Sequence, residues 1–171
     1  MLDPRDGVYI VSITEDALDA RDIVLASPRD SFDSRIRISI TLDADTTEEQ
    51  RDRFTAYHLP ATKPLLAKGM FEFAKLDSGE VITSEDCTLE NPLFQHMGPL
   101  CKMLNSNRDL LAKVCEQSSG VEHESPLAVG IDHIGIDVRA RFGLVRIVLP
   151  EPIQNPEDAQ DCIERLLASC Q

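Results

Sequence analysis

The feature that most constrains the fold is a pair of alternating segments near the C-terminal end of the sequence. Apolar and charged residues alternate strictly over Gly135 to Arg141, and Leu144 to Leu149 follows directly after Phe142-Gly143. A period of two is typical of a strand with one buried face and one exposed face. Two such strands with a two-residue connection predict an antiparallel hairpin, and Leu127 to His133 predicts a third strand beside it.

Helices are predicted on either side of these strands. Asn91-Pro92 has the residues favoured at the start of a helix, and Gly98-Pro99 is expected to kink or interrupt the helix that follows. Asn107 can cap a second helix, and Asn155-Pro156 can open a terminal one. We therefore expect residues 91–171 to form a three-stranded antiparallel sheet flanked by helices.

The first half reads as a second group of strands. Strands are predicted at Gly7 to Ile13, at Ser34 to Leu42, and at Met70 to Leu76 with Glu80 to Thr83 as its hairpin partner. Arg21 to Ser27 is compatible with a short strand or a helical turn.

One helix is predicted within this half. Thr46 and Glu49 have capping-box spacing and open a helix that runs to about His58, whereas Pro60 to Gly69 is expected to be at best a short, irregular helix. The predicted fold class is α+β.

The second half resembles the C-terminal domain of HugZ-like haem-utilisation proteins. That family has a His-Met dipeptide opening a helix, a Gly-(Ile/Phe)-Asp-(Leu/Val)-Arg strand and a (Leu/Val)-Pro-Phe-Pro-x-Pro-like exit. The corresponding residues here are His96-Met97, Gly135 to Arg139 and Leu149 to Pro152. The resemblance covers 91–171 and implies a haem-handling protein.

In that family the domain follows a split β-barrel of the pyridoxamine-phosphate-oxidase type, which binds FMN. Arg51 to Pro60, followed by Phe71-Glu72-Phe73, is similar to the helix, His-Pro turn and next strand of that barrel, and Asp22 to Phe32 is similar to a preceding segment. The resemblance thus implies a reduced split-barrel half over 1–90. Few residues precede Gly7, and Ser12 to Ile23 lacks the family's His and Asn, so FMN binding is disfavoured.

The resemblance places candidate haem contacts in the second half. His96 is the candidate iron ligand, and a second ligand can come from Cys101, Met103, His123, His133 or another subunit. Arg139 and Arg141 are candidates to neutralise the propionates. The candidate cofactor-binding set is therefore His96, His133, Arg139 and Arg141.

Each of these residues also has a purely structural interpretation. His96 borders an apolar helical stripe and is then a packed or surface histidine, and His133 is a packed strand residue. Arg139, Arg141 and Arg146 are then partners in ion pairs on a sheet face. His58 is expected at a helix C-terminus, favoured by the dipole, and His123, between two glutamates, is expected to be exposed.

Charge and composition restrict the partners. Seventeen Lys and Arg against 30 Asp and Glu give a net charge of −13, which disfavours nucleic acid and anionic membrane surfaces. No apolar run approaches the ~20 residues needed to span a bilayer, and no secretion signal opens the sequence. The five cysteines form no CxxC pair, so we expect reduced thiols in a cytoplasmic setting, an organelle of a eukaryote being an alternative.

Three functional hypotheses follow. The first is a protein that binds or uses haem, with haem degradation included. The second is a non-catalytic interaction module of tetrapyrrole metabolism, because plant relatives with this domain pair bind an enzyme of tetrapyrrole synthesis. The third, disfavoured by the missing strands, is a flavin-dependent oxidoreductase of the pyridoxamine-phosphate-oxidase type. A partial barrel leaves strand edges to cover, so a homodimer is expected.

Overall fold

The computed structural model describes residues 2–3, 8–20, 23–27, 35–59, 62–86, 91–141 and 143–170. The chain forms two compact units, each built from two segments of the sequence. The first unit consists of Met1–Thr55 and Leu59–Glu90, and the second of Ala56–His58 and Asn91–Gln171. Each unit has its own apolar core and is described by itself.

The first unit is built on one antiparallel sheet. Its strands are β1 (Leu2–Asp3), β2 (Val8–Ile13), β3 (Ile23–Ser27), β4 (Ile36–Asp43), β5 (Leu65–Leu76) and β6 (Val81–Thr83), in the order β1-β2-β5-β4-β3 with β6 also paired to β5. A short 3-10 helix, η1 (Glu15–Asp19), connects β2 to β3. Arg21 to Ser27 is therefore a strand over its described part.

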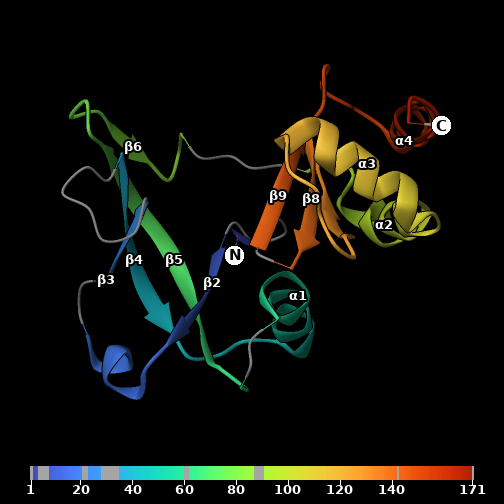
Figure 1. Ribbon diagram of the computed structural model, residues 1–171. Coiled ribbons are helices and arrows are strands. Elements are labelled where there is room, and N and C mark those ends of the chain that lie inside the picture. The colour runs from blue at the N-terminus through green and yellow to red at the C-terminus, as the bar shows by residue number, and fades with distance from the viewer. Residues whose placement is uncertain are drawn as a thin grey trace. The chain divides into compact units, whose positions relative to one another are not determined.

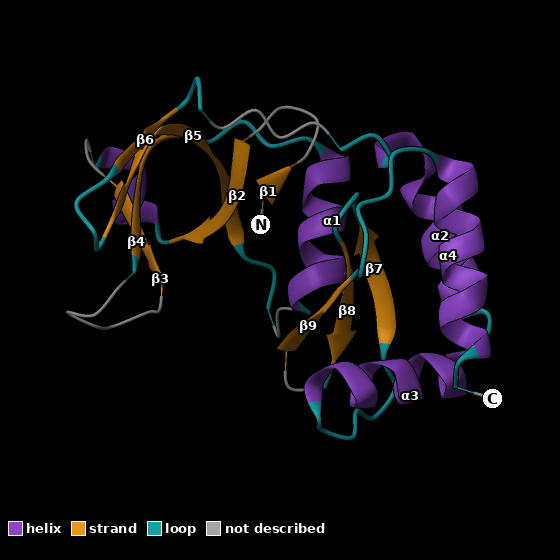
Figure 2. Ribbon diagram, turned by 90° about the horizontal axis from the view of Figure 1, so that it is seen from above, coloured by secondary structure: helices purple, strands orange, loops and turns teal. Residues whose placement is uncertain are grey.

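The long strand β5 organises this sheet. Its first half pairs with β2 and its second half with β6, while β4 runs along its other edge. A bulge between Ser39 and Ile40 bends the β4–β5 pair, and Gly69 lets Ile40 approach closely, since an added Cβ would lie 2.5 Å from its Cδ1. The sheet consequently curls into the half-barrel seen in Figure 2.

Two neighbouring residues of β2, Ile10 and Val11, pack into two different apolar clusters. Ile10 packs with Phe54 and Leu66, whereas Val11 packs with Ile40 and Ala67 on the opposite face. All of these side chains are buried. The curled sheet therefore has apolar packing on both faces, as expected for a partly closed barrel.

The helix predicted after β4 is present, but its cap lies one residue later than predicted. In α1 (Glu48–His58), Thr47 Oγ1 accepts from Gln50 N at 3.2 Å, and Thr47 N donates to Gln50 Oε1 at 3.1 Å. Thr46 is buried, and its hydroxyl accepts from Arg51 Nε at 2.8 Å. The prediction of Thr46 and Glu49 as the capping box was therefore wrong, because the Thr46 hydroxyl is hydrogen-bonded to Arg51 and does not cap the helix.

The prediction of an irregular helix over Pro60 to Gly69 was also wrong where the chain is described. Residues 60 and 61 lie outside the described residues, and β5 already begins at Leu65. Pro64 precedes the first strand residue, where its missing N–H costs no ladder hydrogen bond. The prolines predicted an irregular segment, but Leu65–Gly69 pairs with β2 and is therefore a strand.

The second unit contains the predicted three-stranded antiparallel sheet. Its elements are η2 (Phe94–His96), α2 (Met97–Asn105), α3 (Arg108–Ser119), β7 (Leu127–Ile131), β8 (Gly135–Ala140), β9 (Gly143–Val148) and α4 (Pro156–Ala168). The sheet order is β7-β8-β9, and all three helices contribute to one core with it. Figure 1 shows α2 and α3 beside β8 and β9, and α4 contacts these two helices. The α+β class, with a curled half-barrel and this small sheet, is confirmed.

The ends of these elements refine the prediction. Asn107 and Asn155 cap α3 and α4 by accepting from Leu110 N and Asp158 N, as expected. Gly98-Pro99 does not kink a longer helix, because it falls in the first turn of α2, where proline is tolerated. No helix in the described part of the chain has the length and apolar character to cross a bilayer.

The last turn of α1 belongs to the second unit and packs against its sheet. Tyr57 Oη donates to Asp137 Oδ2 at 3.1 Å. Gly130 on β7 makes room for this ring, because a Cβ at position 130 would lie 1.9 Å from Tyr57 Oη. A glycine is therefore required at position 130 as long as Tyr57 is bound there.

We predict that Gly130→Ala lowers the free energy of unfolding by about 1–3 kcal/mol, because the new methyl overlaps the tyrosine. Urea unfolding followed by circular dichroism measures the change. In a Tyr57→Ala background the cost of Gly130→Ala should fall below about 0.5 kcal/mol, within the usual additivity error. Gly98→Ala is the matched control, since a Cβ there meets nothing within 4 Å. Equal losses of unfolding free energy in Gly130→Ala and Gly98→Ala would contradict the prediction.

Candidate functional site

Asn91 joins the two segments that carry the candidate histidines. Its side-chain amide donates to the carbonyl of Ile131 at 3.0 Å and lies 3.7 Å from Met97 Sδ. Its Oδ1 accepts from Leu93 N at 3.0 Å, which fixes the turn before η2. The segment that opens α2 and the end of β7 therefore meet at one side chain.

His96 lies at this junction, between η2 and α2. Its backbone N–H donates to the carbonyl of Leu93 at 2.9 Å, and its side chain is exposed. The ring has no hydrogen-bond partner among the described residues. Leu93 is buried, and Phe94 and Met97 are half-buried, so the imidazole stands at the edge of an apolar surface. That arrangement leaves both ring nitrogens available to a ligand.

His133 lies in the turn after β7, not within the strand as predicted. The Asp132 side chain closes this turn, because its Oδ1 accepts from Ile134 N at 2.9 Å and from Gly135 N at 3.0 Å. The carbonyl of His133 accepts from Ile153 N at 2.7 Å. These polar groups interrupt the β7 pairing, which ends at Ile131.

The two nitrogens of His133 differ in environment. The ring is half-buried, and Nδ1 is buried without a hydrogen-bond partner among the described residues. Nε2 is not enclosed in this way and has no partner in the described part of the chain. A ligand can therefore reach His133 through Nε2.

Arg146 supports the turn that carries His133 through ion pairs, which confirms its structural interpretation. Its guanidinium lies 2.6 Å from Asp132 Oδ2 and 2.8 Å from Asp137 Oδ1. Burial opposes the charge, but the hydrogen bonds to both aspartates raise the pKa of Arg146 above its usual value. The hairpin register gives the signal for this contact, since Asp137 and Arg146 are directly opposite each other.

Arg139 and Arg141 lie at the other end of β8. Arg139 Nη1 donates to the carbonyl of Ala56, and Arg141 forms a 2.8 Å ion pair with Glu124. His133 lies in the turn before β8, and Arg139 is four residues beyond the first residue of that strand, Gly135, or about 13 Å along it. The structure therefore connects the segments that carry His96 and His133 through Asn91, whereas Arg139 and Arg141 contact other residues at the far end of β8.

The alternative second ligands have other contacts. Burial, with a contribution from Asp137, raises the pKa of the Cys101 thiol to about 12, and Met103 packs against the apolar core. His123 is half-buried, not exposed as predicted, and its Nε2 is 2.7 Å from Ser119 Oγ. His58 ends α1 as expected, and burial lowers the pKa of its imidazole.

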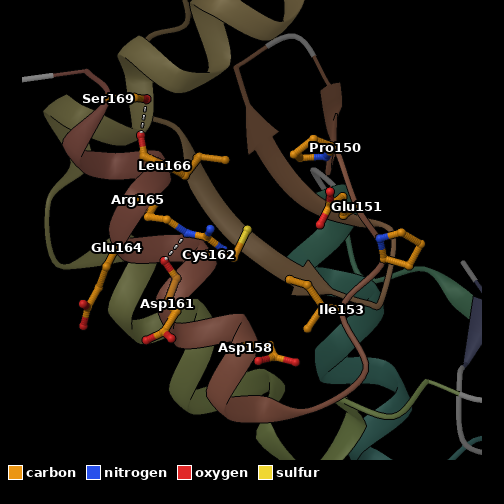
Figure 3. A pocket seen from close by; sticks show the side chains of 11 residues that line it. Pro150, Glu151, Ile153, Asp158, Asp161, Cys162, Glu164, Arg165, Leu166 and Ser169 are labelled. Atoms are coloured by element: carbon orange, nitrogen blue, oxygen red, sulfur yellow. Dashed lines mark hydrogen bonds between the residues drawn. The ribbon is translucent and has the colours of Figure 1, made fainter.

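A pocket of about 900 Å³ lies between α4 and the segment Pro150–Ile153. Figure 3 shows Cys162 and Leu166 pointing from α4 toward this segment. Four carboxylates and one guanidinium, that of Arg165, line the pocket. Haem propionates would be repelled there, and none of the predicted site residues contributes to the lining.

Comparisons with known proteins establish the fold but no family. No family model matches the sequence, and no curated protein matches it. A protein of unknown function from Agrobacterium tumefaciens has a similar structure, with a TM-score of 0.67 and 18% identity over 97% of this chain and 80% of that one. A haem-binding protein from Mycobacterium smegmatis gives a TM-score of 0.43 and 17% identity, over 95% and 80% of the two chains.

The raised pKa of Cys101 predicts a pH dependence of stability. The unfolded thiol ionises from its ordinary pKa of 9.0, whereas the folded thiol keeps its proton until about 12. Its contribution is therefore complete below pH 9 and is lost as the pH rises toward 12, with a loss of about 1.4 kcal/mol at pH ~10.

Urea unfolding at pH ~8 and pH ~10 tests this prediction in wild type and in Cys101→Ala. Other groups also titrate in this range. The test is therefore the loss of unfolding free energy between the two pH values in wild type minus the same loss in Cys101→Ala. We expect wild type to lose about 1.4 kcal/mol more than the alanine variant. Equal losses would contradict the prediction.

Proposed function

We propose that the chain is a haem-binding protein that holds haem at the junction of η2, the start of α2 and the β7–β8 turn. His96 is the proposed axial ligand to iron, and His133 is a proposed second contact. The observation that carries the proposal is the meeting of these two histidine segments at Asn91, with neither imidazole bonded to another described residue. The resemblance of 91–171 to HugZ-like proteins points to the same ligand.

The residues at this junction match several requirements of a haem site. An axial imidazole needs a free ring nitrogen, which His96 provides. The macrocycle needs apolar surface, and Ile134 next to His133 is 46% exposed while Phe94 and Met97 are half-buried. Bound haem would supply the iron and the visible absorption. The surface position suits reversible binding for storage, delivery or sensing.

The arginines do not add to this proposal. Arg139 and Arg141 are bonded within the protein and lie at the far end of β8, and Arg146 is paired with two aspartates. The proposed site therefore depends on imidazoles and apolar contacts. Haem degradation needs an electron donor and further groups, and the proposal here is confined to binding.

Titration of hemin into the purified protein tests the proposal. We expect saturable binding at micromolar hemin with a shift of the Soret band, because imidazole ligation changes the iron environment. His96→Ala should weaken binding at least about tenfold and change the position of the Soret band. Absence of a saturable shift in wild type would remove the proposal.

His123→Ala is the matched control for the loss of one imidazole. His123 is half-buried in the same unit, but Ser119 occupies its Nε2. Hemin affinity and the Soret maximum should therefore stay at the wild-type values. If the two alanine variants lose affinity equally, hemin binds without a specific ligand and the role of His96 is refuted.

A second candidate function is that of an interaction module, and the edge strand β9 favours it. β9 pairs on one side with β8, and among the described residues no strand pairs with its other side. Val148 is 71% exposed and Leu144 44% exposed on this strand. Edge strands with exposed apolar residues recruit protein partners, and the resemblance implies an enzyme of tetrapyrrole synthesis.

Affinity capture from the native source discriminates the second candidate from the first. If it is correct, an identified enzyme of tetrapyrrole synthesis co-purifies in stoichiometric amount with the colourless protein. Val148→Lys should reduce its capture at least about tenfold, because a charged residue on an edge strand opposes pairing. Glu122→Lys adds a positive charge on an exposed loop and should leave capture unchanged. Equal capture by both variants would refute the role of β9.

We also propose that 1–90 is a partial split-barrel region related to FMN-binding barrels and that 91–171 is a HugZ-type C-terminal domain. A homodimer is part of this proposal. Among the described residues of the first unit, Val24, Met70, Phe73 and Val81 are large apolar side chains that are at least 45% exposed. Exposed apolar side chains can mark a surface that a partner covers, and the partner proposed here is a second copy of the chain.

A further inference from the structure

We propose that His133 does not ligate iron but carries its proton on Nε2, from which it donates a hydrogen bond to a carboxylate of the bound ligand, in haem a propionate. This inference rests on the proposed function and assigns separate roles to the two histidines. His96 provides the axial nitrogen. His133 recognises the anionic edge of the macrocycle.

The tautomer follows from the environment of Nδ1. In a neutral imidazole one nitrogen is a donor and the other an acceptor. A buried N–H without an acceptor loses its hydrogen bond to water and gains nothing, whereas an unpaired acceptor nitrogen is tolerated more often. Because Nδ1 of His133 is buried and has no partner in the described part of the chain, the proton belongs on Nε2.

The adjacent carboxylate is not available to change this assignment. Asp132 Oδ1 accepts from Ile134 N, Gly135 N and Arg146 Nη2, and Oδ2 also accepts from Arg146 Nη2. A ligating histidine usually donates its other N–H to a carboxylate or a carbonyl. His133 has no such acceptor, so ligation of iron through Nε2 would leave a buried, unpaired Nδ1–H.

The ligand group that meets this donor is a hydrogen-bond acceptor, because Nε2–H can only donate. Arg146 adds no free positive charge here, since both Asp132 and Asp137 are paired with it. The acceptors at the edge of haem are its propionate carboxylates. The contact proposed for His133 is therefore a charge-assisted hydrogen bond to a propionate.

The backbone that carries the donor is held in place before any ligand binds. The backbone carbonyl of His133 accepts from Ile153 N, and the turn is closed by a hydrogen bond from Asp132 N to the carbonyl of Gly135 at 2.9 Å. A donor held by its own turn loses little conformational entropy when it binds. His133 is thus suited to recognition, whereas the exposed His96 can adjust to the iron.

Nitrogen-15 NMR of the histidine rings at pH ~8 tests the tautomer without any ligand. His133→Gln identifies the His133 signals by their disappearance. We expect the pattern of a protonated Nε2 and an unprotonated Nδ1. A protonated Nδ1 would overturn the inference whether or not the protein binds hemin.

Hemin and its dimethyl ester, titrated in the same aqueous dimethyl sulfoxide, test the ligand contact. His133→Ala should weaken hemin binding about tenfold and binding of the ester less than about threefold, because the ester has no charged acceptor. His133→Gln has an N–H near the position of Nε2 and should restore hemin affinity to within about threefold of wild type. The Soret maximum should not change in either variant.

The outcomes separate the two proposals. If wild type binds neither porphyrin, the proposed function fails while the tautomer assignment stands on the NMR result. If wild type binds hemin but His133→Ala shifts the Soret band in the way that His96→Ala does, His133 is an iron ligand and the inference is wrong. Equal losses for hemin and the ester would also overturn it.

Discussion

The amide of Asn91 is the interaction on which the arrangement of the candidate site depends. One short side chain holds a backbone carbonyl at the end of β7, a backbone N–H before η2 and the sulfur of Met97. An amide can make these contacts together because it has both donors and an acceptor. Aspartate would lose the donors and alanine would lose everything. His96 and His133 are 37 positions apart in sequence, yet the backbone segments that carry them are both bound by Asn91. Neither imidazole ring contacts Asn91 itself.

The charged residues around β8 illustrate why a cluster of arginines in a sequence is weak evidence for an anion site. The protein has a net charge of −13, with 30 Asp and Glu against 17 Lys and Arg. Arg146 forms ion pairs with Asp132 and Asp137, and Arg141 forms one with Glu124. These contacts support turns and strands. Among the predicted site residues, the imidazoles of His96 and His133 are the ones for which no side-chain hydrogen bond is found in the described part of the chain.

Sequence periodicity predicted most of the fold, because strand alternation and helix capping are local signals. Asn107 and Asn155 begin helices where expected, and β8 and β9 pair as the alternation requires. The cap at Thr47 was missed because the competing contact of Thr46 with Arg51 is a side-chain bond with no sequence pattern. The start of β5 at Leu65 was missed because it depends on pairing with a distant strand.

The candidate site was less predictable than the fold for the same physical reason. His96 was singled out through a resemblance, but its junction with the β7–β8 turn arises from Asn91, which the sequence indicated only as a cap. The support of that turn by Arg146 depends on hairpin register. The difference between the two nitrogens of His133 depends on burial of single atoms, which no pattern of residue types encodes.

The position of β5 in the sheet also has a consequence for synthesis of the chain. β2 and β4 both pair with β5 and not with each other, and β3 pairs with β4 alone. While the ribosome makes the protein, the β3–β4 hairpin and β2 emerge first, with unpaired edges and exposed Ile and Val side chains. They stay so until residues 65–76 have left the exit tunnel. The central pairing of this sheet therefore cannot form before β5 emerges, although the strands on both sides of it have already been made.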